Sequence, residues 1–105
     1  MPGKTRKQQL EDLLADDPND AFLRYALAME CAGEGNDEEA LRCLRRVFAD
    51  KLDYVPAYMQ AGKILMRLER LDEARATFKD GITLAQRLGD AHAAGEMEGF
   101  LDTLG

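Results

Sequence analysis

One histidine, His92, and two cysteines, Cys31 and Cys43, are the side chains of this chain best suited to nucleophilic or acid–base chemistry. Any Ser/His/Asp or Cys/His arrangement would have to be built around His92. We expect His92 near the start of the last helix of the chain, where a solvated side chain is the common case. The histidine alone therefore does not indicate a catalytic site.

The two cysteines are 12 residues apart and form no C-x-x-C pair, which argues against a metal site or a redox motif. Arg67 is the one basic residue whose spacing could bring it near Cys31 and lower the pKa of that thiol. We predict that both cysteines are reduced and that Cys31 is buried or half-buried and inert. The sequence also lacks a phosphate loop and metal-ligand spacing, so we expect no metal, no cofactor and no enzymatic activity.

Charge and length limit the classes of partner. The chain has 105 residues, which fits one domain of common size, and a formal net charge of −6 at pH 7. This charge repels nucleic-acid phosphate and anionic lipid, so we expect neither nucleic acid nor a membrane as partner. The first residues lack the apolar stretch of a signal peptide, and no run of 18 apolar residues follows. We therefore expect a cytoplasmic protein.

Apolar residues recur with a period of 3.6 between short segments that contain proline or glycine, which predicts an all-α fold of about six helices. Thr5, followed three residues later by Gln8, has the form of a capping box. Asn36, Asp72 and Asp90 are expected to cap later helices. We predict one domain over residues 1–105, made of an N-terminal helix (4–17), two helical pairs (20–50 and 55–87) and a C-terminal capping helix (90–104).

The two helical pairs repeat one pattern of large and small residues, at a spacing of 36 residues in their first helices and 34 in their second helices, because the turn inside the first pair is two residues longer. The second pair carries it as Tyr58, Ala61, Gly62, Leu65, Ala74, Phe78 and Gly81, and the first pair as Phe22, Tyr25, Ala26, Met29, Ala40, Leu44 and Val47. We expect Gly62 to face Ala74 and to let the two helices of its pair approach closely.

With these residues the chain resembles the tetratricopeptide repeat family, and as a whole the small stand-alone proteins of that family from bacteria. The resemblance covers about residues 20 to 87. It implies antiparallel helical hairpins stacked as a short right-handed superhelix, an α-solenoid. Two repeats are fewer than the three that such arrays usually need, so the first and last helices are expected to act as caps.

A second apolar stripe remains once the repeat positions are assigned. The resemblance implies a concave groove, lined by the first helices of the repeats, that binds a peptide or a partner helix. Its floor would hold Leu23, Leu27, Met59, Met66 and Met97, and its polar edge Glu30, Lys63 and Arg67. Methionine suits such a site because its flexible side chain fills irregular gaps.

The sequence leaves three uses of this stripe open. It predicts a non-catalytic interaction module with a protein or peptide partner of unknown identity, but the stripe could also cover itself or form the seam of a weak homodimer with a scaffold role. One variant of the family grips the carboxylate tail of chaperones. Leu23, Leu27, Gln60 and Ala94 stand where that variant has polar ligands, so we expect an apolar or amphipathic partner segment instead.

Overall fold

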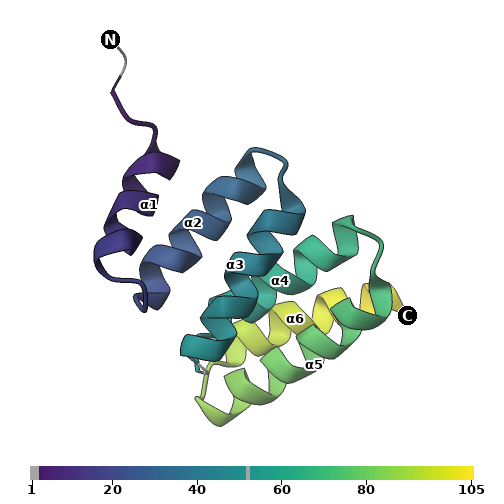
Figure 1. Ribbon diagram of the computed structural model, residues 1–105. Helices are drawn as coiled ribbons and strands as arrows, with labels where there is room; N and C mark the ends of the chain where they lie inside the picture. The colour runs from purple at the N-terminus through teal and green to yellow at the C-terminus, as the bar shows by residue number, and fades with distance from the viewer. Residues whose placement is uncertain (1–2, 52) are drawn as a thin grey trace. The chain divides into compact units, whose positions relative to one another are not determined.

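The computed structural model describes residues 3–51 and 53–105, and these form six α-helices (Figure 1). The helices are α1 (Arg6–Asp16), α2 (Ala21–Gly33), α3 (Asp37–Asp50), α4 (Val55–Arg67), α5 (Leu71–Arg87) and α6 (Ala91–Leu104). They belong to two compact units, with α1 to α3 in the first and α4 to α6 in the second. The predicted all-α fold is confirmed, whereas the prediction of one domain over the whole chain stays a prediction.

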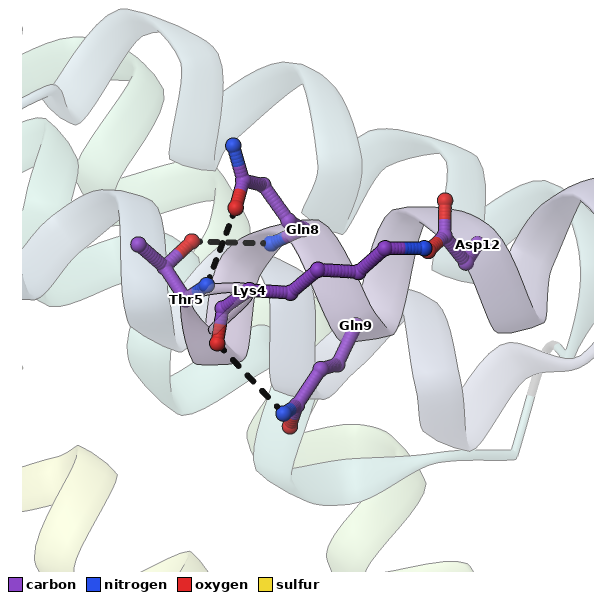
Figure 2. Close-up of polar contacts among 5 residues, drawn as sticks. All are labelled: Lys4, Thr5, Gln8, Gln9 and Asp12. Atoms are coloured by element: carbon purple, nitrogen blue, oxygen red, sulfur yellow. Dashed lines mark hydrogen bonds and ion pairs between the residues drawn. The ribbon is translucent and has the colours of Figure 1, made fainter. Parts of the chain in front are cut away.

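The start of α1 is fixed by side chains within its own first turn. The Thr5 hydroxyl accepts a hydrogen bond from the Gln8 N–H at 3.1 Å, and the Gln8 side-chain oxygen accepts one from the Thr5 N–H at 2.9 Å (Figure 2). Lys4 pairs with Asp12, and the Gln9 amide donates to the Lys4 carbonyl. The predicted capping box is therefore present, and it satisfies two backbone donors that a helix start leaves open.

In the first unit α2 packs against both α1 and α3 (Figure 1). Leu10 and Leu14 are the buried residues of α1. Arg6 of α1 pairs with Glu30 of α2 at 2.8 Å, and Lys7 of α1 pairs at 3.6 Å with Glu34, the residue that follows α2. The buried side chains of α2 and α3 include Ala28, Cys31, Ala40, Leu41, Leu44 and Val47.

In the second unit α5 packs against α4 and α6 at two glycines. A Cβ atom on Gly62 would lie 2.4 Å from Cε1 of Phe78, and a Cβ on Gly81 would lie 2.6 Å from Sδ of Met97. Both glycines thus permit close approach of their helices, which the sequence predicted for Gly62. The atoms nearest Gly62 belong to Phe78 rather than to Ala74, because the buried Phe78 ring fills the space that the missing side chain leaves.

Three helix ends share a turn with one residue in the left-handed region. Gly35 (φ 80°), Glu69 (φ 59°) and Gly89 (φ 76°) occupy this position after α2, α4 and α5. After α4, the Glu69 N–H donates to the Met66 carbonyl and the Arg70 N–H to the Leu65 carbonyl, the bonding of a Schellman motif. Glutamate therefore stands where the other two turns use glycine, and its Cβ makes this conformation costly.

Two of the three other predicted caps are present. The Asn36 side chain accepts a hydrogen bond from the Glu39 N–H at 3.3 Å, and the Asp90 side chain accepts one from the Ala93 N–H at 3.1 Å. The prediction for Asp72 was wrong, because α5 begins at Leu71 and Asp72 lies inside its first turn. There its carboxylate pairs with Arg75 and complements the positive end of the helix dipole.

Candidate functional site

Four of the predicted site residues lie on α4, in the second unit. Met59, Lys63 and Met66 follow one another at intervals of four and three residues, the spacing that aligns side chains on one face of a helix. All three are half-buried, and Arg67 is exposed at the end of the same helix. We call this set of residues, Met59, Lys63, Met66 and Arg67, the α4 face. It combines two adaptable apolar side chains with two cations.

An aromatic ring of α6 lies beside the α4 face. The Lys63 ammonium is 5.9 Å from the centroid of the Phe100 ring, within the range of a cation–π interaction. The Phe100 ring in turn stacks on the Phe78 ring, with 5.4 Å between centroids and 9° between planes. Because Phe78 is completely buried, Phe100 links the ammonium to the core of the second unit. Helical periodicity places Phe100 on α6 but does not pair it with Lys63, so the sequence alone does not add Phe100 to the site.

Met97 does not belong to a surface. Its exposed fraction is 0%, and its sulfur lies where a side chain on Gly81 would otherwise stand. The sequence placed Met97 on the floor of the groove, and the structure corrects this assignment. A thioether that fills the space above a glycine is a core contact.

The other predicted site residues lie on α2, in the first unit. Leu23, Leu27 and Glu30 have the same helical spacing as the residues of the α4 face. Leu23 is half-buried, but Leu27 is only 9% exposed, and Glu30 is bound to Arg6 of α1. Leu27 and Glu30 therefore already have contacts within the protein, and Leu23 is the apolar residue of the three that keeps exposed surface.

The residues first considered for chemistry are not poised for catalysis. The His92 side chain is 88% exposed, and its Nε2 lies 2.6 Å from a carboxylate oxygen of Glu96, a surface contact between residues i and i+4 of one helix. Cys31 and Cys43 are free and buried, and burial raises the pKa of each thiol. The cation that opposes the rise in the pKa of Cys31 is Lys7 of α1, and not Arg67 as the sequence predicted. Burial of Cys31 was predicted and is confirmed, and a thiol that stays protonated is a poor nucleophile.

Residues 3–51 and 53–105 enclose no pocket, and they contain no cluster of three or more histidine, cysteine, aspartate or glutamate side chains suited to a metal ion. Within the same ranges no helix has the length and apolar character needed to cross a membrane.

Comparison with known proteins identifies the family. Residues 55–88, which contain α4 and α5, match the tetratricopeptide repeat. A tetratricopeptide repeat domain protein from Salinibacter ruber is 33% identical in sequence, with a TM-score of 0.78, and the similarity covers 83% of this chain and 88% of that one. The chain therefore belongs to the tetratricopeptide repeat family, as its sequence predicted.

Two further solved structures are similar. A protein from Bordetella parapertussis is 27% identical, with a TM-score of 0.85 over 97% of this chain and 89% of that one. PcrH, in complex with the chaperone binding region of PopD, is 19% identical, with a TM-score of 0.88 over 93% of this chain and 74% of that one. The likeness to PcrH is one of fold alone. The comparison with curated proteins finds no match.

Proposed function

We propose that this protein is a non-catalytic interaction module that binds a peptide or helical segment of another protein on the α4 face. A tetratricopeptide repeat domain is a protein-interaction module, and the residues of α4 define where this one would bind. The observation that supports the proposal is the pair of half-buried methionines, Met59 and Met66, on either side of Lys63. Side chains of this kind gain apolar contacts when a partner covers them.

The ring of Phe100 would widen the proposed surface. It is half-buried and lies beside Lys63, so a partner on the α4 face would also reach α6. Leu23 on α2 belongs to the first unit and is a separate apolar candidate, whereas Leu27 and Glu30 of that unit have their contacts within the protein. PcrH, which shares the fold, is seen with the chaperone binding region of PopD, and this is consistent with a fold that binds a segment of another protein.

A selection experiment tests the proposal. The full chain is used to select from a library of random 16-residue peptides displayed on phage, and binding of the enriched peptides is measured by fluorescence anisotropy. Met59→Glu/Met66→Glu should lower their affinity at least about tenfold, because two charges would replace apolar contacts worth more than about 1.4 kcal/mol. Leu88→Glu is the matched control, since Leu88 is a 50% exposed leucine just after α5.

Two results would count against this proposal. Equal binding by the wild type and the double variant would show that the α4 face is not the site. A concentration-dependent dimer in sedimentation, dissociated by the same double variant, would instead favour the homodimer. Circular dichroism of both variants checks that they remain folded.

A further inference from the structure

We infer that the segment recognised by the α4 face carries an aspartate or glutamate side chain with apolar side chains on both sides of it along the chain. This inference rests on the proposed function and adds the chemistry of the partner. It comes from the charges of α4 and from the position of Lys63 between two methionines.

Helix α4 carries cations but no carboxylate, in a chain that is negative overall. The sequence of α4, VPAYMQAGKILMR, contains no aspartate or glutamate, whereas the whole chain has a net charge of −6. Among the described residues Lys63 forms no ion pair, and its ammonium lies over the ring of Phe100. On α6 a carboxylate oxygen of Glu96 lies 2.6 Å from Nε2 of His92. A partner carboxylate would therefore supply the anion that the ammonium of Lys63 lacks in this part of the chain.

The surroundings of Lys63 favour such a pair. Lys63 is half-buried, with a methionine about one helical turn away on each side and an aromatic ring beneath its ammonium. A bound segment would exclude water from these groups, and charges attract each other more strongly as water is removed. The pair should thus contribute more than an ion pair between fully exposed side chains.

The two methionines also determine what kind of carboxylate fits. A carboxylate that meets Lys63 has Met59 on one side and Met66 on the other. A side-chain carboxylate inside a segment has neighbours on both sides, and these can contact both methionines. The carboxylate at a chain end has neighbours on one side only, so it would leave one methionine uncovered.

The phage selection described above tests this chemistry directly. Peptides enriched on the wild-type chain should contain aspartate or glutamate, with apolar residues within four positions on each side, more often than the starting library. Attraction by net charge would give the opposite bias, because the chain has a charge of −6. The excess of acidic residues should disappear with Lys63→Gln and persist with Lys79→Gln, the same charge change on an exposed lysine of α5.

Affinity measurements on one enriched peptide complete the test. Replacing its acidic residue with the amide should weaken binding to the wild type about 3- to 10-fold and leave binding to Lys63→Gln unchanged. Amidation of the peptide C-terminus should have no effect. If the acidic residue can be replaced without loss while Met59→Glu/Met66→Glu still abolishes binding, the inference is wrong and the proposed function stands. Loss of affinity on amidation would assign the carboxylate to the chain end and overturn the inference, and unchanged binding by the double variant would overturn the proposed function as well.

Discussion

A methyl group added at Gly62 should destabilise the second unit, although alanine is the better helix former. The new Cβ would lie 2.4, 2.5 and 2.8 Å from Cε1, Cζ and Cδ1 of Phe78. The Phe78 ring cannot move aside cheaply, because it is completely buried and stacked on Phe100. Overpacking of this kind costs about 1 to 3 kcal/mol, and the helix propensity of alanine returns about 1 kcal/mol. With contacts this short we expect a net loss of about 2 kcal/mol.

Gly95 and Gly99 of α6 provide the matched control for Gly62→Ala. Both are exposed helical glycines, and a Cβ added at either would meet no atom within 4 Å. Gly95→Ala and Gly99→Ala should each stabilise the protein by about 0.5 to 1 kcal/mol, because alanine loses less conformational entropy on folding. The same substitution is thus expected to have opposite signs on α4 and α6.

Urea unfolding followed by circular dichroism measures these differences. The midpoint should fall for Gly62→Ala and rise for Gly95→Ala, at similar slopes. The double variant Gly62→Ala/Phe78→Leu should lose less stability than the two single variants lose in sum, because the smaller leucine side chain relieves the contact with the new methyl group. A midpoint for Gly62→Ala at or above that of the wild type would mean that the Phe78 ring has room to move and that the added methyl group does not overpack the core.

Three further predictions follow from the described contacts. Met97→Ala should lower the free energy of unfolding by about 2 to 5 kcal/mol in urea titrations, as expected of a buried methionine. A loss below about 0.5 kcal/mol would show that Met97 is an exposed residue and not part of the core. Glu69→Gly should raise it by about 0.5 to 1 kcal/mol, because glycine adopts the left-handed turn freely, and a lower urea midpoint would show that the Glu69 side chain contributes more than the turn conformation costs. Burial raises the pKa of Cys31 and Cys43 above the ordinary 9.0, so between that pH and the raised pKa the unfolded chain has lost protons that the folded chain keeps. The thiols should therefore leave the free energy of unfolding constant below pH 9 and lower it as the pH rises above 9. The fall should be smaller in Cys31→Ala/Cys43→Ala, and an equal fall in that variant would show that the thiols play no part.

The helices were predictable because their signals are local. The capping box of Thr5 and Gln8, and the caps at Asn36 and Asp90, need only residues within one turn, and all three are present. Asp72 shows the limit of such signals. An aspartate fits the cap and the first turn of a helix equally well, and the choice between these positions depends on how the preceding turn closes at Glu69.

The candidate site was predictable only in part, because burial depends on packing between helices. The resemblance to the family assigned Met59 and Met97 alike to the floor of the groove, since both are methionines outside the repeat pattern. The structure separates them, as Met97 lies against Gly81 and is buried, whereas Met59 keeps exposed surface. Likewise, no spacing within one helix relates Lys63 to Phe100, because the two residues come from different helices.

The five methionines of the chain allow the most direct test of the proposed binding site. With ¹³C-labelled methionine methyl groups, each assigned by its Met→Leu variant, an enriched peptide is titrated into the protein and the NMR signals are followed to saturation. We expect the signals of Met59 and Met66 to shift most, while that of the buried Met97 changes little. Saturated binding that leaves the Met59 and Met66 signals unmoved would show that the peptide does not bind on the α4 face.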